Sequence, residues 1–397
     1  MKVRSKLFPI YDYRGSNIFH NFHTPIASKP FLSKTTLTQL LLRLGFEMSR
    51  SIPTEDRIST LPDQILCHIL SFVPTKLAAT TSVLSKRWNP LWLSVETLHF
   101  DDQDFETKAT FRDFVSCVFL LRDIMLPLRS FHLKYSDTRS FYQRDLNRFI
   151  HAAVQRREIE NINLNMPYSY CFNLKLPPSI FSCKTLVVLR LTGIQLHDLS
   201  HVVVDLPRLK TLHFSTHEIN KPLYFSPKPF QRFDYLSKLL IGCPAIEELY
   251  APLNTKYLNL NDKVSMNRNL INVEFILKNN HSKKWEWLLE VLKHCPKLQN
   301  LTIHEDYGLI NEDQDNLMSP TIVPECLSTQ LKTFMLSGNK CTEYDIQFAE
   351  YIIQNSKVLN TMSIESPSSL PFSLKRKMIE KLPSSTRAST TCKLLIV

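Results

Sequence analysis

Residue types that could act as nucleophiles or metal ligands occur in this 397-residue sequence, but their spacing assembles no catalytic or metal site. The nine cysteines are scattered, odd in number and without a C-x-x-C pair, which argues against a zinc site and a disulfide framework. Six isolated glycines form no phosphate-binding G-x-G-x-x-G or G-x-x-x-x-G-K-[ST] loop, and H-E-x-x-H and G-x-S-x-G are absent. We therefore expect no cofactor, no metal and no enzymatic activity.

Two further sets of possible catalytic residues, the acidic pairs and the cysteines, are better explained by structural roles. The acidic pairs Glu305-Asp306 and Glu312-Asp313 lie in polar stretches around Gly308 and Asn311, so they are predicted to be loop residues. Buried structural thiols are favoured over a catalytic cysteine. Unpaired cysteines indicate a reducing compartment, so we expect the protein in the cytoplasm and/or the nucleus.

Binding chemistry is concentrated between residues 56 and 95, where aliphatic residues accompany two tryptophans and two arginines. A helix is predicted from Pro62 to about Phe72, with Asp63 in its first turn. Its apolar residues form two adjoining rows, which is wider than one helix contact requires, so two faces must be buried. The rows are Leu61/Ile65/Ile69/Phe72 and Leu66/Leu70/Val73.

Two more short helices are predicted after Pro74. Thr75 is positioned to cap one running to about Val83, and Ser85 to cap another that presents Trp88, Leu91 and Trp92. Because Pro90 removes a backbone donor, this last helix must start late or kink. A unit of this size with surplus apolar surface should dock against something else.

The run Asp56-Arg57-Ile58-Ser59-x-Leu61-Pro62-Asp63-x-Ile65-Leu66, continued by Leu84-Ser85-Lys86-Arg87-Trp88-x-x-Leu91-Trp92, resembles a plant-type F-box. The resemblance implies binding to a Skp-type adaptor, which links the chain to a cullin and a RING subunit. Leu66, Leu70, Leu77 and Val83 are better explained as local core, whereas Leu61-Pro62 and Trp88 are stronger interface candidates. The residues that the resemblance places in or behind the interface are Leu61, Pro62, Ile65, Ile69, Leu84, Arg87, Trp88 and Trp92.

Beyond residue 96 an apolar-x-x-apolar-x-apolar pattern recurs, with the first five occurrences 33, 31, 27 and 23 residues apart. Irregular repetition of a strand-like pattern indicates long, degenerate leucine-rich repeats. The anchors are Val95/Leu98/Phe100, Leu128/Phe131/Leu133, Ile159/Ile162/Leu164, Leu186/Leu189/Leu191, Leu209/Leu212/Phe214, Ile246/Leu249/Ala251, Leu270/Val273/Phe275, Leu298/Leu301/Ile303, Leu331/Phe334/Leu336 and Leu359/Met362/Ile364.

Helical faces precede several of these strands. Leu236–Leu249 recurs 52 positions later as Leu288–Leu301, each with a Cys-Pro that ends the helix. Similar faces begin at Leu146 and Phe348. Helix and strand in alternation predict an α/β horseshoe whose parallel strands line the concave side. Exposed strand and loop positions are candidates for target binding, although a solvated face is the commoner reading for each: Arg190, Lys210, His213, Glu248, Tyr250, Glu274, Thr302 and His304.

The C-terminal part, with Val323-Pro324-Glu325-Cys326-Leu327, Tyr351-Ile352-Ile353 and the ending Arg387-Ala388-Ser389-x-x-Cys392, resembles the FBD domain of plant F-box/leucine-rich-repeat proteins. This implies a C-terminal cap on the repeats. The predicted fold is therefore α/β, divided into an extension (1–55), a three-helix F-box (56–95), leucine-rich repeats (96–324) and an FBD-like domain (325–397).

Charge gives little support for nucleic-acid binding. Of the net charge of +11, residues 1–50 contribute +6, and no basic stripe with interleaved aromatics follows. The segment 1–47 is either a targeting peptide or dispensable, with Met48 a plausible start. No apolar stretch is long enough to cross a membrane.

We therefore predict a substrate-recognition adaptor of an SCF-type ubiquitin ligase, whose F-box binds the Skp-type adaptor while the repeats bind an unidentified target protein. The alternatives are a leucine-rich-repeat scaffold that does not engage a ligase, and an enzyme with an unrecognised site on the concave face, for which no residue gives positive support.

Overall fold

The computed structural model describes residue 58 and residues 60–136, 143–156, 158–166, 175–194, 196, 199–215, 232–255, 267–278, 283–305, 322–338, 341–367 and 372–397. The chain divides into two compact units, Met1–Leu61 and Pro62–Val397. In the first, the Leu61 amide donates to the Ile58 carbonyl over 3.1 Å. The predicted extension (1–55) and the start at Met48 lie outside the described residues.

Short helices follow Pro62 where the sequence predicts three: α2 (Asp63–Leu70), α3 (Thr75–Thr80) continued by the 3-10 helix η2 (Thr81–Val83), and α4 (Trp88–Leu91). Pro62 and Pro74 stand immediately before α2 and α3. A proline there costs little, because the first helical residues need no intrahelical N–H partner.

The predicted caps by Thr75 and Ser85 are wrong. Thr75 is itself the first residue of α3, and its hydroxyl accepts instead from the backbone N–H of His99 at 2.7 Å. No side chain caps α4, which begins at Trp88 and not directly after Ser85. This late start, one of the two predicted consequences of Pro90, puts the proline in the first turn, where no intrahelical hydrogen bond is lost.

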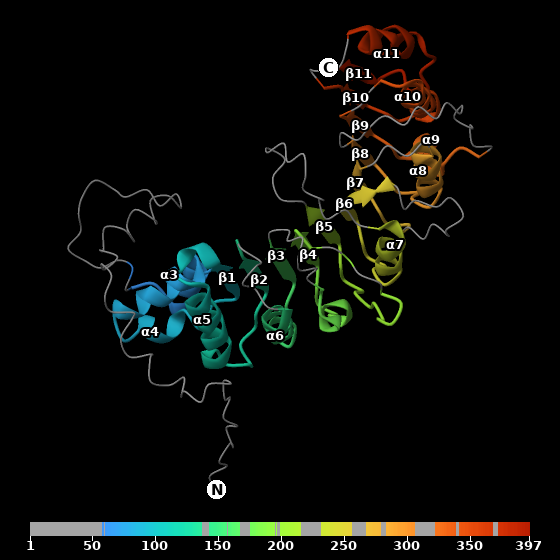
Figure 1. Ribbon diagram of the computed structural model, residues 1–397. Helices are drawn as coiled ribbons and strands as arrows, with labels where there is room; N and C mark the ends of the chain where they lie inside the picture. The colour runs from blue at the N-terminus through green and yellow to red at the C-terminus, as the bar shows by residue number, and fades with distance from the viewer. Residues whose placement is uncertain are drawn as a thin grey trace, which may run out of the picture. The chain divides into compact units, whose positions relative to one another are not determined.

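Eleven strands form one open, wholly parallel sheet within the described residues, in chain order from β1 to β11 (Figure 1). Ten of them fall on the predicted apolar patterns, whereas β11 was not predicted as a strand. The strands are β1 (Thr97–Asp101), β2 (Ser130–Lys134), β3 (Asn161–Asn165), β4 (Val188–Thr192), β5 (Thr211–Ser215), β6 (Glu248–Asn254), β7 (Asn272–Lys278), β8 (Asn300–Glu305), β9 (Thr333–Ser337), β10 (Thr361–Glu365) and β11 (Lys393–Ile396).

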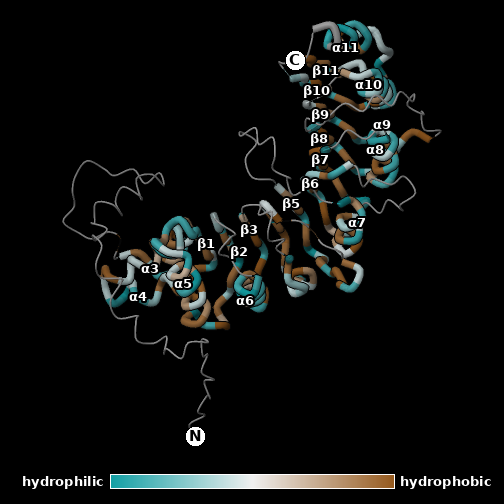
Figure 2. Tube along the Cα trace, in the orientation of Figure 1, coloured by the Kyte–Doolittle hydropathy of each residue, from teal (hydrophilic) through white to brown (hydrophobic). Residues whose placement is uncertain are grey.

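The strand register brings equivalent anchors together. Leu98 pairs with Phe131, which pairs with Ile162, and the same correspondence continues to Met362 and Leu394. None of the thirty predicted anchor side chains is more than 4% exposed. Figure 2 shows hydrophobic colour along the strands and hydrophilic colour on α6 and α8. The repeated pattern therefore buries one continuous apolar layer on one face of the sheet.

Helices α5, α6, α7, α8 and α10 lie along one side of the sheet (Figure 1). The predicted helical faces correspond to α6, α7, α8 and α10, while α5 and α11 were not predicted. The remaining helical elements are η3 (Asp102–Asp104), α5 (Lys108–Leu121), α6 (Gln143–Val154), η5 (Pro178–Ser182), α7 (Phe233–Ile241), α8 (Lys284–Lys293), α9 (Glu325–Thr329), α10 (Glu343–Asn355) and α11 (Phe372–Ser384).

The two helices that align residue by residue, α7 and α8, both end before their Cys-Pro pair, as the sequence pattern predicts. Cys243 and Cys295 follow α7 and α8 and are fully buried. The Cys243 thiol donates to the carbonyl of Leu239 at 3.2 Å, so it satisfies a backbone group at the helix end. At the preceding position a Cβ on Gly242 would lie 2.3 Å from the carbonyl oxygen of Val204, which explains why the close approach of these segments requires glycine.

Candidate protein-binding surface

The two apolar rows of α2 differ in burial. Leu66 and Leu70 point into the core, at 0% and 3% exposure. In the other row Ile65 and Phe72 are 45% and 60% exposed, and Ile69 is half-buried. Within the described residues one row therefore makes the local core, and no described element covers the other. The prediction that both faces are buried is left to a contact outside the described residues.

The segment between η2 and α4 adds to the exposed apolar surface. Val83 and Leu84 are 62% and 39% exposed. Leu77 is half-buried, so among the four residues favoured as core, Leu66 and Leu70 are confirmed and Val83 is wrong. Val83 is the last residue of η2, and its side chain points away from the core.

Both tryptophans of this module are buried. Trp88 is 5% exposed and Trp92 9%, and Leu91 beside them is 6% exposed. Trp88 was among the stronger interface candidates, and the structure places it in the core of the module. The predicted residues accessible to a partner are Pro62, Ile65 and Leu84, with Leu61, Ile69 and Arg87 partly accessible. Phe72 is also accessible but was not among the predicted site residues. Its position in the same apolar row as Ile65 could have identified it as one.

An ion pair lies on the same module. Nε and Nη2 of Arg87 contact Oδ1 of Asp63 at 2.8 and 2.6 Å, joining the segment before α4 to the first turn of α2. Both side chains keep substantial solvent contact. An exposed pair of this kind contributes at most about 1 kcal/mol to folding, so its stronger effect is to hold two polar groups in fixed geometry beside apolar residues.

Burial disfavours the thiolate form of several cysteines. Burial, followed by the charge of Asp63, raises the pKa of Cys67, whose thiol donates to the Leu91 carbonyl at 3.6 Å. Burial raises the pKa of Cys243 to about 12 and that of Cys326 to about 12. Neutral thiols are poor nucleophiles and poor metal ligands. Across the described ranges no group of three His, Cys, Asp or Glu side chains is arranged to hold a metal ion.

The helical module is joined to the first edge of the sheet. Helix α3 contacts β1, and the Thr75 hydroxyl satisfies the His99 N–H. Arg122, almost fully buried, donates to the carbonyls of Leu93 and Pro127 at 2.5 Å each, which ties the end of the module to the segment before β2. Burial, and then repulsion from Arg156, lowers the pKa of Arg122 to about 10.

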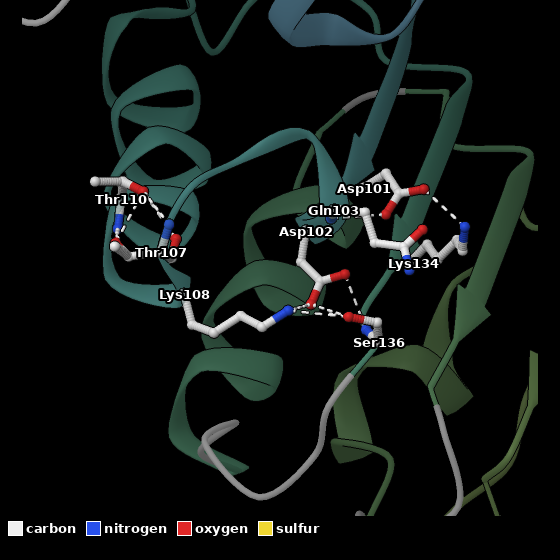
Figure 3. Close-up of polar contacts among 8 residues, drawn as sticks. All are labelled: Asp101, Asp102, Gln103, Thr107, Lys108, Thr110, Lys134 and Ser136. Carbon is white, nitrogen blue, oxygen red and sulfur yellow. Dashed lines mark hydrogen bonds and ion pairs between the residues drawn. The ribbon is translucent and has the colours of Figure 1, made fainter.

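A buried carboxylate fixes the far end of β1 (Figure 3). Asp102 is 1% exposed and accepts from the backbone N–H and hydroxyl of Ser136, both at 2.9 Å, and from Lys108. Thr107 and Thr110 form a capping box that starts α5 beside Lys108. These contacts join the end of β1 to the segment after β2 and to the first turn of α5.

Of the predicted target-binding candidates, Arg190, His213, Tyr250, Glu274 and Thr302 share one strand position in neighbouring strands, on the face opposite the buried anchors. Glu248 lies two residues earlier in its strand and His304 two residues later, and Lys210 precedes β5. The acidic loop prediction is wrong for Glu305, which is the last residue of β8, while Asp306, Glu312 and Asp313 lie outside the described residues.

Comparison with known proteins agrees with this arrangement. The family model of the F-box domain matches residues 58–100, which cover the helical module and β1 up to Phe100. The model of the FBD domain matches residues 319–364, where α9, β9, α10 and most of β10 lie. The chain therefore carries an F-box domain and an FBD domain.

Its relatives have the same domain names. An FBD-associated F-box protein of Arabidopsis thaliana is 29% identical over 85% of this chain and 99% of its own length. An F-box/FBD/LRR-repeat protein of that plant is 26% identical over 86% of this chain and 94% of its own length. An F-box protein of the same plant is 38% identical over 50% of this chain and 58% of its own length. The predicted resemblance to the plant F-box/leucine-rich-repeat/FBD family is confirmed.

F-box domains generally bind Skp-type adaptors, and proteins that contain them generally serve as non-catalytic substrate adaptors of SCF ligases. No enzymatic domain is matched here. Among the described helices none has the length and apolar character needed to cross a membrane.

Proposed function

We propose that this chain is a substrate-recognition adaptor of an SCF-type ubiquitin ligase. Its F-box binds a Skp-type adaptor and through it a cullin and a RING subunit. The parallel sheet β1–β11 with its helices on one side, the array, holds a target protein. Such an adaptor accelerates ubiquitin transfer by raising the effective concentration of the target near the loaded enzyme. The single observation that carries the proposal is the uncovered apolar row of α2 in a module matched as an F-box.

The energetics of that surface support a protein partner. Ile65, Phe72 and Leu84 are large apolar side chains exposed on a module whose own core is already filled by Leu66, Leu70 and Trp88. Fully burying an exposed large apolar side chain contributes about 1.5 to 3 kcal/mol, and these three are roughly half exposed. A partner that covers them therefore gains a few kcal/mol toward binding. Arg87 and Asp63 at the margin supply fixed polar contacts.

The remainder of the proposal concerns the array. We regard the parallel strands and their one-sided helices as a leucine-rich-repeat solenoid and the FBD domain as its C-terminal cap. Support comes from the regular register of the anchors and from β9, β10 and β11, which continue the same sheet. A location in the cytoplasm and/or the nucleus belongs to the same proposal, since the eight described cysteines are all free thiols.

The test is co-purification of the full chain with a Skp-type adaptor. Ile65→Asp and Phe72→Asp place a charge on the outward row and should each weaken adaptor binding at least about tenfold, because an unpaired carboxylate would be buried in the interface. Ile241→Asp is the matched control: Ile241 is 68% exposed on α7, away from the F-box, and its variant should bind normally.

Surface variants are preferable to Trp88→Ala, which removes a core side chain and would lower binding through unfolding alone. If well-folded wild-type protein does not bind the adaptor, the ligase proposal falls and the scaffold alternative takes its place. Equal loss in Ile65→Asp and Ile241→Asp would show that the outward row is not the contact.

A further inference from the structure

The strand face opposite the helices carries three rows of side chains, one at each outward strand position. The first row is hydrogen-bonded to itself over five strands: Thr211 donates to Glu248 at 3.0 Å, Asn272 to Glu248 at 3.3 Å, Asn300 to Asn272 at 2.6 Å and Thr333 to Asn300 at 2.5 Å. Polar groups satisfied in this way stabilise the sheet and offer little to a partner.

The central row contains His132, Asn163, Arg190, His213 and Tyr250 on β2 to β6, paired in register. Arg190 is exposed and forms no hydrogen bond or ion pair with any described residue. The side-chain amide of Asn163 beside it is equally without a hydrogen bond there. Adjacent strands lie about 4.8 Å apart, so the Arg190 side chain is within reach of groups on the strands to either side.

Several other charged side chains on this face have partners. Lys134 donates to Asp101 at 2.8 Å across β1 and β2. Glu274 is 2.8 Å from His304 Nε2, and Nδ1 of that histidine is 2.5 Å from the Ser337 hydroxyl. Arg190 therefore has no counter-ion among the described residues, and its two register neighbours, Asn163 on β3 and His213 on β5, carry no opposite charge.

Aromatic stacks hold the two histidines of the central row in place. His213 stacks on Tyr250 with ring centroids 4.2 Å apart and planes within 19°, and His132 stacks on His99 at 4.6 Å. Burial lowers the pKa of His132 to about 4, with further repulsion from His99 and Arg190. Burial and Arg190 also lower the pKa of His213, against an opposing effect of Glu274. At neutral pH both rings are uncharged and each keeps one N–H donor.

We infer that Arg190, with the donors of Asn163, His132 and His213 around it, is a carboxylate-binding site for an extended acidic segment of the target protein laid across β2 to β5. Charge complementarity carries the assignment, because a lone guanidinium among neutral donors pairs with a carboxylate in a charge-assisted, bidentate contact. The identity of the segment as part of a ligase target rests on the proposed function, but the site itself does not.

The test uses the full chain and a fluorescein-labelled peptide of twelve glutamates, with a glutamine peptide of the same length as the neutral probe. Fluorescence anisotropy at low ionic strength should show binding of the glutamate peptide only. Arg190→Gln should weaken that binding about tenfold, the loss expected for one charge-assisted contact. Arg376→Gln is the matched control, since Arg376 is an exposed arginine on α11, and it should bind like wild type.

Three results would overturn the inference. They are equal binding of the two peptides, no binding of the glutamate peptide to folded protein, and equal losses in Arg190→Gln and Arg376→Gln. A phosphoserine peptide that binds where the glutamate peptide does not would also overturn the assignment to carboxylate. Co-purification of Arg190→Gln with the Skp-type adaptor should be normal, so failure of adaptor binding and failure of this site are separate observations.

Discussion

The F-box helices and the parallel array use apolar residues in opposite ways. In the array, all thirty predicted anchor side chains are buried against their neighbours. In the F-box, Ile65, Phe72, Val83 and Leu84 remain exposed although each belongs to an apolar sequence pattern. This difference shows that an apolar sequence pattern identifies side chains that need to be buried. It does not identify the element or the protein that buries them. In the sheet each strand is covered by its neighbours, whereas the F-box keeps one apolar face that no described element covers, and we propose that another protein covers it.

The largest expected effect separates two phenylalanines. Phe275 is fully buried in β7 against Trp287, whereas Phe72 is 60% exposed. Phe275→Ala should lower the free energy of unfolding by about 3 to 5 kcal/mol through lost contacts and a cavity, and Phe72→Ala by less than about 0.5 kcal/mol. Urea denaturation followed by circular dichroism measures both. Comparable losses would mean that the F-box face is covered within the chain and would remove the contrast.

A buried ionic cluster tests whether the array depends on polar contacts that the F-box lacks. Lys284 contacts Glu305 and lies 3.3 Å from Asp345, which also accepts from Trp285 Nε1 at 3.1 Å. Burial alone would lower the pKa of Lys284, but Asp345 and Glu305 outweigh it and raise that pKa. Lys284→Ala removes the cation that both buried carboxylates contact and should lower the free energy of unfolding by about 3 kcal/mol.

The control for that variant is Lys293→Ala on the same helix. Lys293 pairs with Glu290 at 2.6 Å near the surface, so its loss should change the free energy of unfolding by less than about 0.5 kcal/mol. Equal unfolding midpoints for Lys284→Ala and Lys293→Ala would show that the buried cluster does not stabilise the array.

The smallest expected effect is a pH dependence. Because the folded pKa of His132 is about 4, below its ordinary value of 6.5, the unfolded chain binds this proton first as pH falls. Stability from the neutral ring is complete above pH 6.5 and is lost between about pH 6.5 and 4. His132→Asn should flatten this acid slope by about 1 kcal/mol, a modest value because the ring keeps solvent contact. Thermal unfolding of the wild type and the variant as a function of pH measures this slope, and equal slopes would show that His132 does not contribute to it.

Much of the fold was predictable because the strand pattern repeats. Ten strands and the faces of α6, α7, α8 and α10 follow from spacing alone. Helix α5 was not predicted, although Thr107 and Thr110 cap it, because its exposed apolar residues Leu120 and Leu121 disturb a clean apolar face. Strand β11 was not predicted because it is a short edge strand in which Leu395 is 51% exposed.

The binding surface was predictable only in part. The two rows of α2 could be read from the sequence, but not which row would be buried, since Ile65 and Leu66 are equally apolar. Trp88 illustrates the same limit: its type suits an interface hot spot, and packing of α4 placed it in the core. Arg190 was one of eight polar candidates, and only the structure showed that Glu274 and His304 pair with each other while Arg190 has no counter-ion among the described residues.

The sequence by itself determined the F-box, the repeating strands and the absence of a recognisable catalytic motif, because these depend on local spacing along the chain. The tertiary structure decided which apolar row faces outward, that Thr75 bonds β1 instead of capping a helix, and which cation on the open sheet face lacks a counter-ion. Those outcomes depend on contacts between residues distant in sequence, and burial and pairing are properties of such contacts rather than of any residue alone.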